Sequence, residues 1–213
     1  MEIVSKPDLG LHVINSSSIF PRMSLPTMAF KEWSLVCAAL ASGRQSVILR
    51  KGGIAEGRAG FSWQHREFAL FPTHFHEQSQ HLRTVDQQDA VPVESAEHAI
   101  SLIATLEMSV ILTDWEQILA LAPFHFWTEE TVRARFDYTG DRALSVGVLR
   151  VARLQQPYSF PDAPGFGGCR SWVKIPEVPP QGAAIPVLDD ATHARRMADL
   201  TQILKPARIP NHV

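Results

Sequence analysis

The sequence predicts a single α+β domain with a mainly antiparallel sheet, or a small barrel, flanked by helices. The chain has 213 residues and is 45% hydrophobic, so it is long enough and apolar enough to bury a core of its own. Segments with strand-like and helix-like spacing both occur, but at irregular intervals and without the alternation of a βαβ repeat. No internal repeat of fixed period is present.

The chain is expected to begin with a flexible tail followed by a helix. Residues 1–27 are rich in serine and proline and show no helical or strand period, and Met23 and Met28 could each be an alternative start. Residues 29–41 place apolar side chains at spacings of three and four, which predicts a helix with one apolar stripe. Gly43 follows at the position where a helix commonly ends.

Two short strands are expected on either side of a glycine-rich loop. Residues 47–49 are an apolar run typical of a buried strand, and residues 68–71 form a second strand that Pro72 would end. Between them, residues 52–60 contain four glycines, which indicates a mobile loop or a loop that approaches a ligand closely.

The middle of the chain is predicted to be more helical. Ser95 is a candidate N-cap for a helix that carries Ile100 and Ile103, and residues 110–112 form a strand.

Two further helix starts carry capping signals. Thr113 and Glu116 form a capping-box pair that opens a helix through about Leu121. Thr128 precedes two acidic residues, which favour the first turn of a second helix that ends near Phe136.

The last part of the domain is expected to be strand, loop and strand. Residues 143–153 alternate apolar side chains and are the best strand candidate of the chain. Residues 155–170 contain several glycines and prolines and are expected to be loop, and residues 172–175 form a final short strand. A weak helix is expected over residues 190–204.

These elements divide the chain into three expected parts: a tail at 1–27, a domain at 28–176 and a Pro-rich extension at 177–213 that carries the weak helix. The domain has no apolar run long enough for a membrane span, and no basic-then-apolar leader opens the chain. We therefore expect a cytoplasmic protein with no membrane partner.

Composition and motifs exclude several common classes. Two cysteines are too few for a disulfide framework or a four-cysteine zinc site. A net charge of −2 gives no overall attraction to nucleic acid. The chain has no P-loop, no dinucleotide-binding fingerprint, no nucleophile elbow and no His-Glu-x-x-His helix, so no cofactor is strongly implied.

Local charge is more informative than the total. Residues 44–66 carry five cations against one acid, and residues 133–153 carry five arginines against two acids. Between them, residues 77–116 carry eight acids and a single arginine. These stretches are either solvated faces of opposite sign, or the two basic ones meet on a surface that binds phosphate.

Histidines cluster in the second quarter of the chain. His74 and His76 would share one face of a continued strand, and a third ligand from His65, His81 or Glu77 would complete a catalytic-type metal site. The alternative is a polar strand end with surface histidines.

Three other side chains are candidates for catalysis. Cys169 precedes Arg170 in a glycine-rich turn, where a cation and loop amides would stabilise a thiolate nucleophile. Glu56 and Glu67, with Lys51 nearby, would recruit a magnesium ion for phosphodiester cleavage. The alternatives are a small residue packed under the turn, and ordinary loop and edge-strand carboxylates.

Aromatic residues are interleaved with the basic ones. Trp63 lies between Arg58 and Arg66, and Trp172 follows Arg170. Such mixtures suit stacking of bases beside phosphate contacts, but they also occur in cores where arginine side chains reach past apolar rings to water.

Several stretches together resemble the bacterial domain of unknown function 1802 family over about residues 28–176. They are Ala29-Phe30-Lys31-Glu32-Trp33, residues 49–54, residues 67–73 with His76, residues 149–151, residues 167–173, His125 with Trp127, and Arg135-Phe136. The resemblance implies a link with restriction-endonuclease-type domains, and so a nucleic-acid role or a nuclease-type protein partner. The element order also resembles the small barrels of PUA-like nucleic-acid readers.

The leading hypothesis is a non-enzymatic domain that binds DNA or RNA. The expected binding residues are Arg50, Lys51, Gly52, Gly53, Arg58, Trp63, Arg66, Arg150, Arg170 and Trp172.

Two other functions are compatible with the sequence. A metal-dependent hydrolase or nuclease would use Glu56, Glu67 and Lys51, or the histidines at 74 and 76. An accessory protein would act through a protein partner, with the acidic middle segment and the Pro-rich end as docking surfaces.

Overall fold

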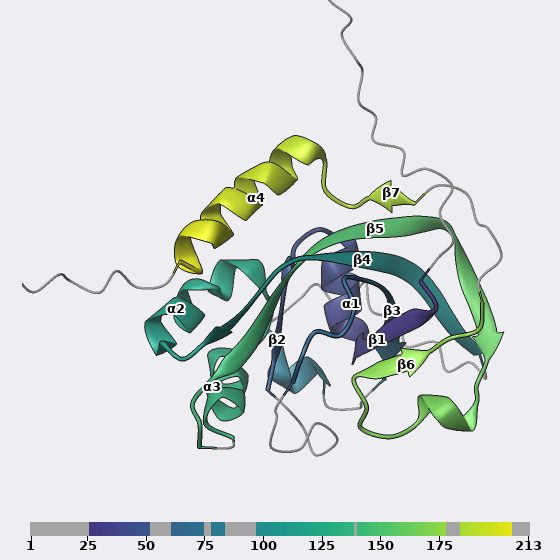
Figure 1. Cartoon of the computed structure of the whole chain (residues 1–213), viewed down its shortest axis with the longest axis horizontal. Helices are drawn as coiled ribbons and strands as arrows, with labels where there is room; N and C mark the ends of the chain where they lie inside the picture. Colours follow the sequence, from purple (N-terminus) through teal and green to yellow (C-terminus); the bar gives the residue numbers. More distant parts are fainter. Residues whose placement is uncertain are drawn as a thin grey trace, which may run out of the picture.

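The protein is described by a computed structural model for residues 26–51, 61–74, 78–83, 97–138, 140–177 and 184–205. In these ranges it is a curled sheet with helices packed around it (Figure 1). In chain order the elements are β1 (Met28–Trp33), α1 (Ser34–Ala41), β2 (Val47–Arg50), β3 (Glu67–Thr73), the 3₁₀ helix η2 (Gln78–His81), β4 (Glu97–Leu112), α2 (Trp115–Ala120), η4 (Ala122–Phe124), α3 (Glu129–Asp137), β5 (Leu144–Pro161), η5 (Pro164–Phe166), β6 (Trp172–Lys174), β7 (Ile185–Pro186) and α4 (Asp190–Ile203).

The sheet is mainly antiparallel. Its strands lie in the order β2-β5-β4-β3-β1-β6, and β7 pairs with the middle of β5, at Ala152 and Arg153. The neighbours run antiparallel except β1 and β3, which are parallel with Ala29 opposite Ala69. The predicted α+β class, with a mainly antiparallel sheet flanked by helices, is therefore confirmed.

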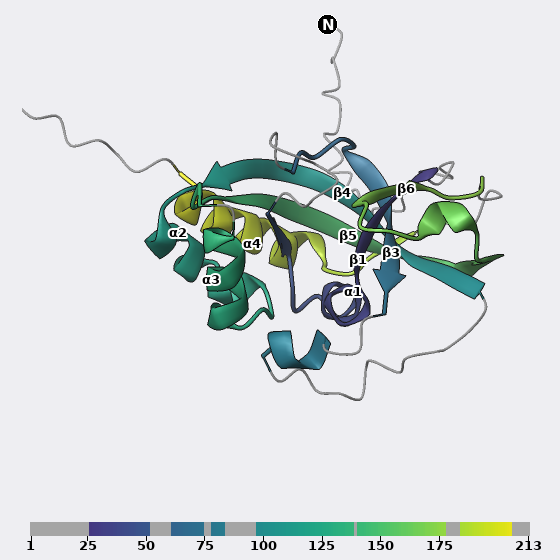
Figure 2. The ribbon, with the colours of Figure 1, turned by 90° about the horizontal axis from the view of Figure 1, so that it is seen from below.

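The curl of the sheet comes from its two long strands. β4 and β5 pair along almost their whole length, and register shifts interrupt the pairing between Ile100 and Leu102 and between Leu106 and Met108. Such irregularities bend and twist a strand pair. Figure 2 shows the result, a half-barrel in which the two long strands arch over β1, β2 and α1.

Two apolar clusters pack against the sheet. The main cluster includes Phe30 and Phe68 on the inner face of β1 and β3, both fully buried, and extends to Leu200 of α4. A second cluster includes Ala29, Phe71 and Phe166, with Ala29 and Phe71 on the other face of these two strands. Neighbouring residues of β1 thus point into different clusters, as expected for a central strand.

The predicted helix at 29–41 is wrong in its first half. Residues 28–33 form the central strand β1, and the helix begins at Ser34. Because both faces of β1 are buried, apolar residues occur at successive positions and their spacing resembles a helical stripe.

The predicted helix after Ser95 is also wrong, because this segment belongs to β4. Leu102 and Ala104 face the main cluster and Ile103 packs against the second, so the strand is apolar on both faces. The strand expected at 110–112 is the C-terminal end of β4.

Later elements follow the prediction more closely. Thr128 caps α3 by accepting a hydrogen bond from the amide of Thr131, as predicted. α2 is capped by Asp114 and not by Thr113. β5 continues to Pro161, so the first part of the expected loop at 155–170 is strand.

The last helix packs on the sheet as part of the same body. α4 lies beside β5 and β4 (Figures 1 and 2). His193 Nε2 is hydrogen-bonded to Glu107 Oε2 of β4 at 2.8 Å, Arg196 donates to Ser46 Oγ at 2.8 Å, and Leu200 is fully buried. None of the described helices is long and apolar enough to cross a membrane.

Candidate functional site

The curl brings the end of β2 opposite the β1–β6 edge of the sheet. Arg50, the last residue of β2, donates from Nη2 to the carbonyl oxygen of Lys31 at 3.1 Å and to Ser171 Oγ at 3.3 Å. We call this junction the seam; it is marked by Arg50, Lys31 and Ser171, and it extends to the nearby residues Glu32, Arg135 and Trp127. One guanidinium therefore ties together strands that share no backbone ladder in the described sheet.

An aromatic cluster lines the inner face beside the seam. The Arg50 guanidinium lies 4.6 Å from the ring centroid of Phe30. Trp63 stacks on Phe30 at 5.4 Å with an interplanar angle of 27°, and its Nε1 donates to Ser145 Oγ at 3.1 Å. The cluster consists of Phe30, Phe61, Trp63, Phe68 and Trp172.

The outer margin of this cluster carries exposed cations. His65 and Trp172 are half-buried, and their rings meet edge to face at 5.1 Å. Arg66 and Arg170 are exposed next to them in sequence, and neither guanidinium has a hydrogen bond or ion pair with any residue that the structure describes. We call these four residues the rim.

A second group of aromatic rings packs around a half-buried arginine, Arg135. Arg135 of α3 lies 3.7 Å from the ring centroid of Trp127 and 5.4 Å from that of Trp33, and donates to the carbonyl oxygen of Leu49 at 3.3 Å. Burial lowers the pKa of Arg135 to about 10; the charge of Arg50 acts in the same direction, and Glu32 acts against it.

Glu32 is the most unusual side chain of the seam. It is 1% exposed, and its Oε1 accepts a hydrogen bond from the Trp33 amide at 2.8 Å. Its Oε2 has no hydrogen-bond partner, and no ion pair joins it to Arg135 within the described ranges. A buried carboxylate oxygen without a donor is costly, so this atom requires an explanation.

His125 is buried close to the same group. Burial, together with the positive charges of Arg83 and Arg135, lowers the pKa of His125 to about 3. Its Nδ1 accepts a hydrogen bond from the amide of Trp127 at 3.2 Å, which is consistent with a neutral ring.

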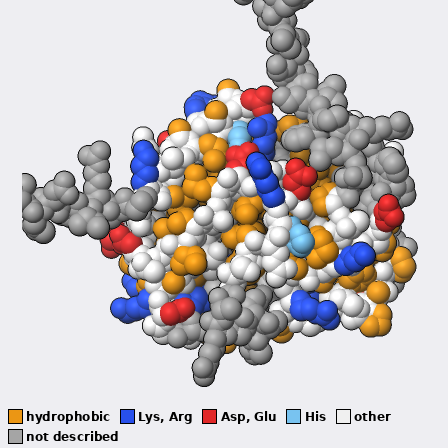
Figure 3. Space-filling model, viewed as in Figure 1, with side chains coloured by type: hydrophobic (Ala, Val, Ile, Leu, Met, Phe, Trp, Pro, Cys, Tyr) orange, Lys and Arg blue, Asp and Glu red, His pale blue; other side chains and the backbone are white. Residues whose placement is uncertain are grey.

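The two basic stretches do meet, but most of their cations are already bound. Arg50 and Arg135, one from each stretch, are close enough that the charge of Arg50 helps to lower the pKa of Arg135. Lys51 donates to the carbonyl oxygens of Phe136 and Ala143 and forms an ion pair with Asp141. The face seen in Figure 3 mixes cations with acids and apolar side chains.

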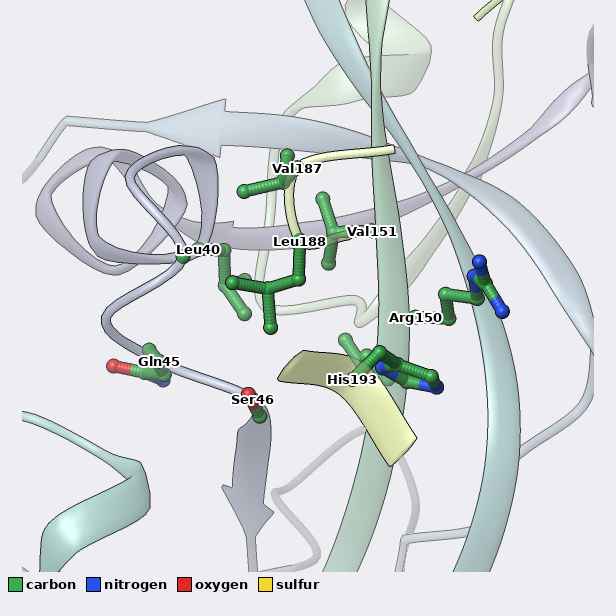
Figure 4. Close-up of a pocket in the computed structure, with 10 residues that line it drawn as sticks. Leu40, Gln45, Ser46, Arg150, Val151, Val187, Leu188 and His193 are labelled. Carbon is green, nitrogen blue, oxygen red and sulfur yellow. The ribbon is translucent and has the colours of Figure 1, made fainter. Parts of the chain in front are cut away.

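Arg150, in contrast, lies away from the seam. It forms an ion pair with Asp190 of α4 and lines a small pocket together with Leu188 and His193 (Figure 4). Ser145 of the same strand faces Trp63, on the other side of the sheet. The structure therefore does not bring Arg150 together with the other predicted binding residues.

The candidate nucleophile Cys169 is exposed on the turn before β6. Lys31 reaches this turn and donates from Nζ to the carbonyl oxygens of Phe166 at 2.7 Å and Gly168 at 2.9 Å. Burial lowers the pKa of Lys31, and the nearby Cys169 opposes this effect. Lys31 thus fixes the turn that presents Cys169 and Arg170.

The remaining candidates that the structure describes, Glu67 and His74, do not form part of a metal-binding cluster. Glu67 is exposed on β3, and His74 is exposed just after the end of that strand. Within the described ranges no three His, Cys, Asp or Glu side chains lie close enough together to hold a metal ion. The candidates Gly52, Gly53, Glu56, Arg58 and His76 lie outside the described residues.

Three residues of the seam were not among the predicted site residues: Glu32, Trp127 and Arg135. All three occur in stretches that carry the family resemblance. A lone acid in the apolar segment 29–41 was a usable signal, because charged residues are rarely buried without a specific role.

Comparisons with known proteins give a family and a set of solved structures. A family model described as "Domain of unknown function (DUF1802)" matches residues 29–199. The crystal structure of ASCH from Zymomonas mobilis is 16% identical, has a TM-score of 0.42, and aligns over 81% of this chain and 94% of that chain. A mutant ZmASCH protein from the same organism is 14% identical, with a TM-score of 0.44 over 84% and 99% of the two chains. No curated protein matches the chain.

Proposed function

The chain belongs to the family described as "Domain of unknown function (DUF1802)", and because that description names no activity, we propose a function from the geometry of the seam: binding of single-stranded nucleic acid. The observation that carries the proposal is the rim. There, the half-buried ring pair His65–Trp172 lies beside Arg66 and Arg170, whose guanidiniums have no partner in the described part of the chain.

The rim combines the two contacts that single strands offer. Guanidinium groups bind phosphate oxygens through charge-assisted, bidentate hydrogen bonds. Half-exposed aromatic faces stack on unpaired bases, which a duplex does not present. Arg66 and Arg170 therefore contact phosphates, while His65 and Trp172 contact a base.

Other expected binding residues take supporting roles in this proposal. Arg50 holds the seam closed, Lys51 is bound to Asp141, and Trp63 packs inside the aromatic cluster. Their charges and rings are already engaged, so in this proposal they do not contact the strand.

The proposal is tested by titrating the protein with labelled single-stranded RNA, single-stranded DNA and a duplex of the same sequence. Single strands should bind more tightly than the duplex. Arg66→Ala and Arg170→Ala should each weaken binding about tenfold, the effect of one hydrogen-bonded charge.

The matched control is Arg195→Ala, which removes the same charge from the exposed face of α4. Equal loss in Arg195→Ala would mean that binding depends on overall charge and not on the rim. Absence of binding to all three nucleic acids would contradict the proposal and favour the protein-partner hypothesis.

A further inference from the structure

Several buried polar atoms near the seam have no hydrogen-bond partner. In the described residues the unpaired buried atoms are Glu32 Oε2, Trp127 Nε1, Trp172 Nε1 and Arg150 Nε. Glu32 and Trp172 directly follow Lys31 and Ser171 in sequence, and Trp127 packs on Arg135. Buried polar groups in proteins are nearly always hydrogen-bonded, and each exception points to a bound water or ligand. Near the seam, one acceptor (Glu32 Oε2) and two donors (Trp127 Nε1 and Trp172 Nε1) thus have no hydrogen-bond partner.

Arg135 is the common neighbour of these atoms. Its guanidinium stacks on Trp127, lies near Trp33, and is close enough to Glu32 for the carboxylate to influence its pKa. A guanidinium has five N–H donors, and one hydrogen bond, to Leu49, is found for it in the described ranges. Arg135 therefore has donors to spare next to an unpaired carboxylate oxygen.

These groups specify the chemistry of a ligand. A carboxylate oxygen accepts hydrogen bonds, so the unpaired Glu32 Oε2 offers a place for an N–H donor. The Trp127 indole and the Arg135 guanidinium need an acceptor close to that donor. With two guanidiniums and one carboxylate, the seam has a net positive charge, which favours a ligand that also carries a negative group.

We propose that the seam is a base-reading site, in which Glu32 Oε2 accepts a hydrogen bond from the N–H edge of one nucleobase of the bound strand. The edge of a nucleobase sets a donor beside an acceptor, and the attached phosphate supplies the negative charge. Glutamate accepting from a base amino group is an established readout chemistry. The proposal rests on the proposed function and adds base preference to it.

In this proposal the base approaches Glu32 from the side of the rim. Arg50, Trp33 and Arg135 are half-buried around the fully buried carboxylate, and Phe30, the neighbour of Glu32 on the inner face of β1, contacts Trp172 at 4.9 Å. A strand held by its phosphates at the rim can therefore direct one unpaired base towards β1. The rim supplies affinity, and Glu32 supplies discrimination.

The test uses a labelled all-uracil RNA strand and three strands in which a single central base is changed to A, C or G. Wild-type protein should prefer one central base. Glu32→Gln keeps the size of the side chain and the Oε1 acceptor but places an NH₂ group at Oε2, so the preference should fall by about tenfold or more.

Glu67→Gln is the matched control, because it makes the same change on an exposed carboxylate of β3 and should leave the preference intact. Thermal unfolding of each variant shows whether it is folded. If Glu32→Gln does not fold, Trp127→Phe removes an indole N–H while keeping an aromatic ring, and it should also reduce the preference.

The outcomes separate the two proposals. A wild-type protein that binds no strand contradicts the proposed function, and the base-reading site falls with it. A wild-type protein that binds all four strands equally, or a folded Glu32→Gln protein that keeps the preference, overturns the base-reading site alone. Parallel competition with the four mononucleotides shows whether the site takes a base in a strand, as proposed, or a free nucleotide, which would overturn it.

Discussion

Trp63 lies directly against Gly147 on the inner face of the sheet. A Cβ atom added to Gly147 would be 2.2 Å from Cζ2 of Trp63, far inside the normal contact distance. The missing side chain lets the indole cross β5, reach Ser145 with its Nε1, and stack on Phe30. The position of the aromatic cluster therefore depends on a glycine in a strand.

Substitution of this glycine should displace the indole. Gly147→Ala is expected to lower the free energy of unfolding by about 1–3 kcal/mol, the usual effect of an overpacked core. Chemical denaturation checks this. Gly165→Ala is the control, since a Cβ at Gly165 meets no atom within 4 Å. Equal stability of the two variants would show that Trp63 moves away freely.

His125 should make stability depend on pH. Its pKa is lowered to about 3 in the folded protein, so on acidification the unfolded chain binds a proton near pH 6.5 and the folded protein does not. Stability contributed by the neutral ring is complete above about pH 6.5 and falls by about 1.4 kcal/mol per pH unit below it.

His125→Asn tests this because the amide oxygen can accept the Trp127 amide hydrogen bond in place of Nδ1. Urea unfolding of both proteins is measured between about pH 6 and pH 4. The variant should lose less stability per pH unit than the wild type. Identical slopes would show that His125 is protonated in the folded protein.

The C-terminal helix should unfold together with the sheet. Leu200 of α4 is fully buried in the main cluster. Leu200→Ala is expected to lower the free energy of unfolding by about 2–5 kcal/mol, as in other buried leucines. Ile185→Ala, at a residue that is 56% exposed, should have a much smaller effect. A separate early transition of α4 would contradict the expectation of one cooperative unit.

The two cysteines should differ in reactivity. Cys169 is exposed, whereas Cys37 is buried and burial raises the pKa of its thiol. A thiol reagent should therefore modify one cysteine per native chain and both after denaturation. Mass spectrometry identifies the modified residue. Rapid modification of Cys37 in the native protein would mean that α1 opens readily.

The sequence predicts elements well where one face of a strand or helix is buried. Thr128 with its two following acids marks the start of α3, and the helix at 190–204 is found as α4. The same reasoning fails for β1 and β4, because strands buried on both faces lose the alternation by which strands are recognised. These segments are strands because they pair with segments far away in the sequence, and the spacing of apolar residues along the chain does not reveal those partners.

The site is predicted less completely for a related reason. Arg66, Arg170 and Trp172 are local signals, since cations and rings adjoin in sequence. In the sequence, Arg150 looks like a further binding residue, but it forms an ion pair with Asp190 of α4. The sequence around Arg150 does not show this contact, because the partner lies 40 residues later in the chain. Glu32 belongs to the site because of tertiary contacts, which the short sequence motif around it does not show.

The salt dependence of binding to a labelled single-stranded RNA tests the account most directly, because phosphate contacts release counterions. The logarithm of the affinity of the wild-type protein should fall linearly with the logarithm of salt concentration. Arg66→Ala and Arg170→Ala should each reduce that slope by about 0.7, the value for one phosphate contact on a single strand, and Arg195→Ala should not. Affinity that is independent of salt, or slopes that are the same in all four proteins, would contradict a phosphate-binding rim.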